Sequence, residues 1–247
     1  MKVKQLLKRS DTIVGLVRDF KKISGRHHKT AILAARNRRL MDYLVSHETR
    51  KLQIGAGSST LAGWLCTDIA PKSDEVVYLD ATKPFPFDEN TFNYVFSEHM
   101  IEHITWQEGS LMLRECYRIL RPGGTIRIAT PDLKILIGLY NHPKDPLSDS
   151  YIKWITDRFL IPKGIRVYKA SFVINNAFSA SWGHQFLYDG ELLEMALQEA
   201  GFTSIKRCSP GESDDEHLRG IESHGRIATA EDMVAFETMV FEGKCLA

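Results

Sequence analysis

The sequence has 247 residues, of which 43% are hydrophobic and 26% are charged. A chain of this length can bury a sizeable core, and its composition excludes disordered, collagen-like and coiled-coil proteins. No apolar run approaches the roughly 20 residues of a membrane helix, and the basic residues 1–9 are not followed by the long apolar stretch of a secretory signal. We therefore expect a cytoplasmic protein.

Charge is divided unevenly along the chain. Residues 1–50 hold 13 Lys or Arg and 4 Asp or Glu, a net charge of +9, whereas the remaining residues hold 19 and 27, a net charge of −8. In the basic segment, apolar residues recur at helical spacing: Ile13, Leu16, Val17, Phe20 and Ile23. We predict a helical extension over residues 1–50. Its amphipathic helix would pack on the domain, lie on an anionic membrane surface or contact nucleic acid.

Beyond residue 50, short apolar runs alternate with helical patterns, which is typical of a parallel sheet covered by helices. Strands are predicted at 51–54, 65–67, 76–79, 94–96, 125–129, 204–208 and 237–241. Helices are predicted at 106–120, 133–140, 151–159 and 190–200. The prediction is one α/β domain over residues 51–247. It has a doubly wound, mostly parallel sheet of seven strands and an insertion between the fifth and sixth strands.

A glycine-rich turn follows the first predicted strand. Gly55-Ala56-Gly57 lies beyond the carboxyl end of this strand, where open α/β sheets bind ligands. The dinucleotide fingerprint would need a third glycine where Thr60 stands, and no G-K-[ST] phosphate loop occurs. The turn therefore disfavours nicotinamide and ATP as ligands.

Polar side chains lie at the ends of the next three predicted strands, at Asp68, Asp80 and Ser97. A carboxylate after the second strand can accept hydrogen bonds from both ribose hydroxyls, and one after the third strand can accept from an adenine amino group. The order of these residues predicts a nucleoside pocket.

Together these features resemble the class I S-adenosylmethionine-dependent methyltransferases. The resemblance covers residues 50–245 and is carried by the stretches 53–57, 79–97 and 115–132. It implies a Rossmann-like fold and S-adenosylmethionine as cofactor. The implied cofactor-binding residues are Gly55, Ala56, Gly57, Asp68, Asp80 and Ser97. The chain looks closest to type 11-like bacterial members associated with surface-glycan biosynthesis, which carry stretches similar to 97–103 and 182–189.

The first two connections between strands depart from the common fold. Gly55 to Asp68 spans 13 positions and Asp68 to Asp80 spans 12, which is too short for full crossover helices with their loops. We therefore predict abbreviated crossovers. They would leave the adenine edge of the pocket open or covered by the N-terminal helices.

Methyl transfer to a hydroxyl requires in-line alignment of the acceptor and removal of its proton, for which histidine is the natural base near neutral pH. His184 is the first candidate, because the insertion over 141–189 is where a substrate cover belongs. His99, which follows the fourth strand, is the second. Asp132 and Glu98 could orient the base or bind the acceptor, and each could equally be a structural residue.

We expect the acceptor to be a hydroxyl of a small molecule, a sugar or a glycan precursor. Peripheral membrane contact through the basic helix would suit a lipid-linked acceptor. RNA is the alternative, because of the +9 segment. The sequence has no N-P-P-[YF] or D-P-P-[YF] element and no basic patch rich in aromatic residues, so a nucleic-acid partner is disfavoured. A cofactor-binding module without activity is a third hypothesis.

His99-Met-Ile-Glu102-His103 also matches the H-x-x-E-H pattern of some zinc peptidases, in which two imidazoles share one helical face. That remote alternative leaves the glycine turn and Pro122-Gly123-Gly124 unexplained. The four cysteines form no C-x-x-C pair. No metal site is predicted.

Overall fold

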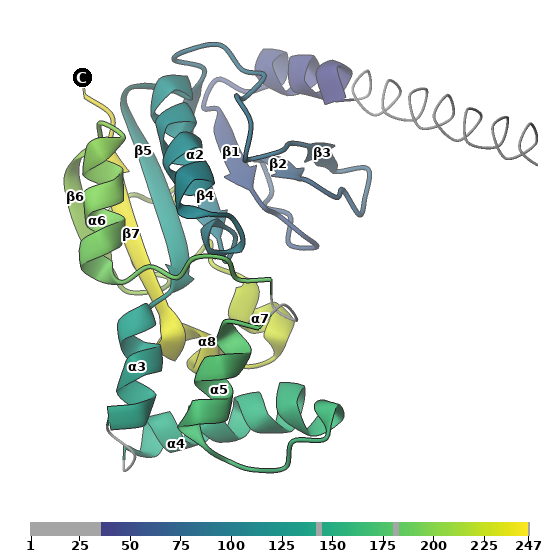
Figure 1. The fold of residues 1–247 in the computed structure, drawn as a ribbon. Coiled ribbons are helices and arrows are strands. Elements are labelled where there is room, and N and C mark those ends of the chain that lie inside the picture. The colour runs from purple at the N-terminus through teal and green to yellow at the C-terminus, as the bar shows by residue number, and fades with distance from the viewer. Residues whose placement is uncertain (1–35, 142–144, 180–182, 247) are drawn as a thin grey trace, which may run out of the picture. The chain divides into compact units, whose positions relative to one another are not determined.

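The computed structural model describes residues 36–141, 145–179 and 183–246 (Figure 1). The chain divides into two compact units, with the boundary between Ser46 and His47. Residues 36–46 of the first unit form a helix. The amphipathic helix predicted around residues 13–23 lies outside the described residues. None of the helices in the described part of the chain has the length and apolar character needed to span a bilayer.

The second unit is built on a seven-stranded sheet in the order β3-β2-β1-β4-β5-β7-β6. Its strands are β1 (Lys51–Ile54), β2 (Leu65–Asp68), β3 (Val76–Tyr78), β4 (Phe92–Glu98), β5 (Leu120–Pro131), β6 (Thr203–Cys208) and β7 (Thr238–Lys244). All pairs are parallel except β5 with β7 and β6 with β7, which are antiparallel. The predicted doubly wound, mostly parallel sheet is confirmed, and every predicted strand overlaps an observed one.

The abbreviated crossovers are also confirmed. Residues 55–64 join β1 to β2 and residues 69–75 join β2 to β3, and neither connection contains a helix. Turns are enough to connect these strands, because each pair is adjacent in the sheet and the strands are short: β1 and β2 have four residues and β3 has three.

Two helices, α2 (Trp106–Ile119) and α6 (Gly190–Glu199), lie over the same face of the sheet in Figure 1. A capping box starts α2, because the Thr105 hydroxyl accepts from Glu108 N and the Glu108 carboxylate accepts from Thr105 N. The helix buries its apolar side: Met112, Leu113, Cys116 and Ile119 are all fully buried. The predicted helix 106–120 is therefore observed within one residue.

The insertion after β5 forms a helical layer of its own. It contains α3 (Leu133–Asn141), α4 (Pro146–Ile155), a π-helical turn (Thr156–Leu160), a 3-10 turn (Ile161–Lys163) and α5 (Ala170–Ala177). These helices enclose a second core with partly buried Phe236 of α8 (Glu231–Glu237). In this layer the Tyr151 hydroxyl donates to the buried Glu237 carboxylate.

The opposite face of the sheet is covered by residues 209–222, which run between β6 and α7 (His224–Ala228). Leu218 from this segment joins the core cluster that includes Trp64 and Phe96. Ile126 faces the side of Phe202, just after α6, so its neighbour Arg127 points to the 209–222 side. Glu212 and Glu222 bind Arg127 there.

Candidate active site

A cavity of about 560 Å³ lies beyond the carboxyl ends of the first four strands. Gly55, Ala56, Gly57, Asp68 and Asp80 all line it. The structure thus brings together five of the six residues predicted to bind the cofactor. The volume of the cavity lies within the range of small-molecule binding sites.

The glycine turn needs both of its glycines, for different reasons. Gly55 has φ +74°, and a Cβ there would lie 2.4 Å from Met100 Cγ. Gly57 has φ +55°, but a Cβ there would meet no atom within 4 Å, because the position opens into the cavity. Glycine at residue 57 therefore leaves room for a ligand against the backbone.

The two predicted cofactor carboxylates are held by local hydrogen bonds. Asp68 Oδ2 accepts from Gly57 N at 2.9 Å and Oδ1 accepts from Ala70 N at 2.7 Å. Asp80 Oδ1 accepts from the backbone N and the hydroxyl of Thr82, at 3.0 and 2.6 Å. Because each carboxylate oxygen has two lone pairs, both groups keep acceptor capacity toward the cavity.

Ser97, the sixth predicted residue, is placed differently. It is paired in register with Ile54 inside the sheet, is buried and is not among the residues that line the cavity. Its hydroxyl has no hydrogen-bond partner in the part of the chain that the structure describes.

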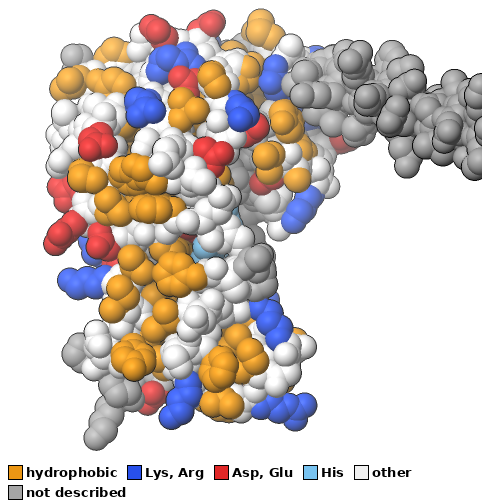
Figure 2. All heavy atoms as spheres, viewed as in Figure 1, with side chains coloured by type: hydrophobic (Ala, Val, Ile, Leu, Met, Phe, Trp, Pro, Cys, Tyr) orange, Lys and Arg blue, Asp and Glu red, His pale blue; other side chains and the backbone are white. Residues whose placement is uncertain are grey.

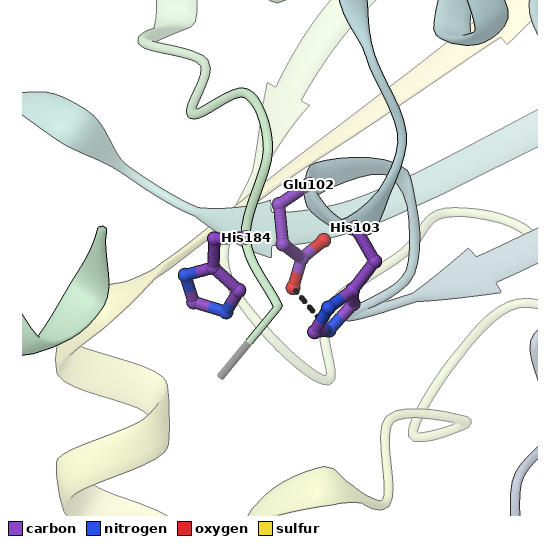
Figure 3. A group of neighbouring side chains, drawn as sticks. All are labelled: Glu102, His103 and His184. Carbon is purple, nitrogen blue, oxygen red and sulfur yellow. Dashed lines mark ion pairs between the residues drawn. The ribbon is translucent and has the colours of Figure 1, made fainter. Parts of the chain in front are cut away.

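A buried carboxylate with imidazoles around it lies beside the same cavity (Figure 3). The Glu102 side chain is 0% exposed, and its Oε2 accepts from Thr130 Oγ1 at 3.0 Å. Its Oε1 lies 3.5 Å from His99 Nδ1 and 3.9 Å from His103 Nε2. His184 flanks Glu102 on the other side, with its ring centroid 4.9 Å from that of His103. A histidine side chain is visible from outside between the sheet and the helical layer (Figure 2).

The two histidines predicted as candidate bases occupy different places. His99 lines the cavity, but its Nε2 is hydrogen-bonded to Thr238 Oγ1 at 2.9 Å and its Nδ1 faces Glu102. His184 does not line the cavity; its neighbours His103 and Gln185 do. His103 therefore presents the imidazole of the cluster to the cavity, and His184 lies behind it.

Asp132 lies away from this site. Its Oδ2 accepts from Arg207 Nη2 at 2.7 Å and its Oδ1 accepts from Lys134 N at 2.9 Å. It lines a separate cavity beside α3 and α6. These contacts give Asp132 the role of a residue that anchors the start of α3.

Glu98 lines the cavity, but its carboxylate is hydrogen-bonded to backbone groups of the protein. It accepts from the backbone N of Ser223 and of His224, each at 3.0 Å. This contact brings residues 223–224 to the cavity from a segment far along the sequence. Neither residue could be predicted, because no local pattern marks them and the tertiary contact with Glu98 places them at the cavity.

The imidazoles differ in their ionisation. Burial opposes protonation of His99, but the Glu102 carboxylate beside it raises its pKa above the ordinary value. Burial lowers the pKa of His184. Burial, together with the positive charge of His99, lowers the pKa of His224 to about 4. His99 and His224 stack with ring centroids 4.2 Å apart, so protonation of one ring opposes protonation of the other.

This difference predicts a pH effect. In the unfolded chain His224 titrates near 6.5, so as the pH falls from 6.5 toward 4 the unfolded state gains a proton that the folded state does not bind. Stability contributed by neutral His224 is therefore present above pH 6.5 and lost near pH 4. We expect His224→Phe to lose less stability than the wild type between pH 7 and 4.5 in urea unfolding. Equal losses would contradict the assignment.

Comparison with known proteins fits the geometry. Residues 52–128 match the family described as "Methyltransferase domain". The matched residues begin in β1 and end in β5, so they include the glycine turn and the strand ends that border the cavity.

The ubiquinone/menaquinone biosynthesis C-methyltransferase UbiE of Blochmanniella floridana is 40% identical over 72 residues. The match covers 28% of this chain and 28% of that protein, so the chain spans just over a quarter of its relative's length. The surface-glycan subgroup is not supported by this relative.

Among solved structures, the chain is similar to a possible histamine N-methyltransferase of Thermotoga maritima. The identity is 16%, the TM-score is 0.46, and the similarity covers 83% of this chain and 88% of that one. A SAM-dependent methyltransferase from Archaeoglobus fulgidus is 18% identical with a TM-score of 0.46, over 87% of this chain and 93% of that one.

Proposed function

We propose that the protein transfers a methyl group from S-adenosylmethionine to a hydroxyl of a small polar acceptor, a sugar or glycan precursor. One observation carries the proposal: the cavity joins a glycine turn with two carboxylates to a cluster of imidazoles. The first part suits a nucleoside, and the second suits an acceptor that must lose a proton.

The residues at the turn fit the cofactor. S-adenosylmethionine, when bound, supplies a methyl group on a positively charged sulfur that is a good leaving group. Gly57 leaves its backbone open to the cavity, and Asp68 and Asp80 offer acceptors for hydroxyl and amino groups. Asp68 also fixes the turn through Gly57 N.

The imidazoles suit a hydroxyl better than an amine or a carboxylate acceptor. A hydroxyl is too weak an acid to ionise unaided near pH 7, so its methylation needs a group that assists proton removal. His103 faces the cavity, and Glu102 and His184 support it from behind. This cluster is the part of the cavity that can activate the acceptor.

The acceptor can be tested directly. The protein would be incubated with labelled S-adenosylmethionine and a panel of nucleotide sugars, lipid-linked glycans, RNA and a ubiquinone precursor, followed by product mass. We expect one methyl group on a hydroxyl of a sugar-containing acceptor. Label found only in RNA, or on a nitrogen or carbon atom, would overturn the hydroxyl proposal.

Cofactor binding is predicted to depend on the turn. Gly57→Val should abolish or strongly weaken the binding of S-adenosylmethionine in calorimetry, because the side chain would fill the cavity. Asp68→Ala should weaken it by about 1–3 kcal/mol, the scale of hydrogen bonds to charged groups.

Gly123→Val provides the matched control for Gly57→Val. Gly123 has a comparable φ of +76° and equally open surroundings, but lies outside the cavity. Like Gly57→Val, the Gly123→Val variant should lose about 1–2 kcal/mol of stability, because it places a side chain on left-handed backbone. Its affinity for S-adenosylmethionine should stay that of the wild type. Equal affinity losses in the two glycine variants would mean that backbone strain, and not the cavity, explains the effect.

A further inference from the structure

We propose that Glu102, His103 and His184 bind a divalent first-row transition metal ion at the edge of the cavity. One ligand atom from each residue can be chosen so that all three lie within 4.8 Å of one another. Figure 3 shows the two imidazoles on either side of the carboxylate.

The spacing is close to that of a metal centre. Zinc–ligand bonds of about 2.0–2.1 Å at tetrahedral angles put neighbouring ligand atoms about 3.3 Å apart. Glu102 Oε1 and His103 Nε2 are already 3.9 Å apart. The His103 side chain is 40% exposed, so its ring has room to turn toward the ion. A small rotation of the His103 ring would therefore bring its nitrogen to the spacing that a metal ion requires from Glu102.

Glu102 gives independent support. Its Oε1 is buried and has no hydrogen-bond partner among the described residues, although it points at two imidazoles. A buried carboxylate oxygen without a hydrogen bond is costly unless another group meets its charge. The other oxygen is held by Thr130, which fixes the carboxylate's orientation as outer partners of metal ligands do.

The donor set selects the type of ion. Two imidazoles and one carboxylate suit zinc, iron(II), cobalt(II) or manganese(II), whereas magnesium and calcium prefer oxygen ligands. Three protein ligands also leave an open coordination position, as in catalytic sites. Because His103 and Gln185 line the cavity, that position would be accessible from the acceptor side.

This site is not the one that the H-x-x-E-H pattern predicts. In that pattern His99 and His103 would share a helical face, but only Ile101–His103 form a short 3-10 turn and His99 precedes it with φ +47°. His99 Nε2 is hydrogen-bonded to Thr238. The second imidazole near Glu102 and His103 in the candidate site is that of His184, which comes from the segment before α6. The peptidase geometry is therefore contradicted.

A metal ion at this position would carry out the activation step of the proposed function, and this role for the ion rests on that function. A Lewis acid next to an acceptor hydroxyl lowers the pKa of that hydroxyl, so the ion would perform the activation assigned above to the cluster. His103 and His184 would then act as ligands, and the proton of the acceptor hydroxyl would pass to water in the open cavity.

The test is metal binding by the full chain after treatment with a chelator. Zinc would be titrated by calorimetry, and cobalt(II) would report four-coordination through its visible absorption. We expect one site whose affinity falls on the order of 100-fold in His103→Ala and in His184→Ala. Zinc should also raise the unfolding temperature of the wild type but not of these variants.

Controls separate this site from adventitious binding by other histidines. His217, whose ring packs on Tyr94, lies outside the cavity, so His217→Ala should bind zinc as the wild type does. His103 is partly exposed, so its variant should fold, which unchanged calorimetry with S-adenosylmethionine would verify. Unchanged zinc affinity in His103→Ala, or an equal loss of affinity in His217→Ala, would overturn the metal site.

The two proposals fail in different ways. Intact cofactor binding and sugar methylation that resist the chelator would overturn the metal site alone. Tight zinc binding without methylation of any hydroxyl acceptor would overturn the proposed function, and with it the role of the metal in that function.

Discussion

Replacing His103 by alanine is expected to lower turnover by roughly 10²- to 10⁴-fold and to leave affinity for S-adenosylmethionine nearly unchanged. His103 is the cluster imidazole that faces the cavity, whereas Gly57, Asp68 and Asp80 are the groups that would hold the cofactor. His184→Ala should have a comparable effect, because its ring packs on His103. Single-turnover rates and calorimetry measure the two quantities.

His99→Gln should have a smaller effect on turnover. Both ring nitrogens of His99 face groups of the chain, Thr238 and Glu102, so His99 is poorly placed to accept an acceptor's proton. His217→Ala serves as the control, since its ring lies outside the cavity. Wild-type turnover in both His103→Ala and His184→Ala would refute activation by the cluster and point to an amine or carboxylate acceptor.

Replacing Arg127 by methionine is expected to lower the free energy of unfolding by about 3–5 kcal/mol. Arg127 is 0% exposed and bonds to Glu222 Oε1 and Glu242 Oε1, each at 2.6 Å. Burial opposes its charge, but Glu222 and Glu242 hold its pKa above the usual range. The variant would leave the buried Glu242 carboxylate with Lys206 Nζ at 3.3 Å and the Ser213 hydroxyl at 2.7 Å, without the guanidinium that neutralises it.

Urea unfolding measures this loss, with Arg121→Met as the control. Arg121 Nε donates to the Asn90 carbonyl at an exposed position, and its loss should cost less than about 1 kcal/mol. Arg127→Met combined with Glu222→Gln and Glu242→Gln should recover part of the stability, because no unpaired charge stays buried. A loss under about 1 kcal/mol in Arg127→Met would show that water or other groups compensate the two carboxylates.

Much of the sheet could be predicted because its strands carry local signals. The apolar runs at 51–54 and 65–67 are short, bounded by turns and buried on both faces, so their pattern shows directly in the sequence. The α2 helix was placed within one residue from its helical pattern, and the capping box at Thr105 became apparent in the structure. The glycine turn and its two carboxylates also follow strand ends, where position along the chain determines position in space.

The candidate acceptor site could be predicted only in part, because its residues meet through tertiary contacts. His184 was chosen for its place in the insertion, but which imidazole faces the cavity depends on how residues 183–189 pass Glu102. Asp132 follows the end of β5, where functional residues are expected, but its carboxylate is paired with Arg207 of β6. Nothing near Ser223 or His224 in the sequence indicates that Glu98 draws them to the cavity.

The position of β7 has a consequence for synthesis and truncation. This strand follows β6 in the chain, yet it lies between β5 and β6 and forms seven register pairs with β5. While the chain emerges from a ribosome, β5 keeps an open edge until residues 238–244 arrive, and β6 has no other strand to pair with in the described sheet. A nonsense mutation before Thr238 would therefore remove the neighbour that attaches β6 to the sheet, and the shortened product is expected to aggregate through the exposed β5 edge.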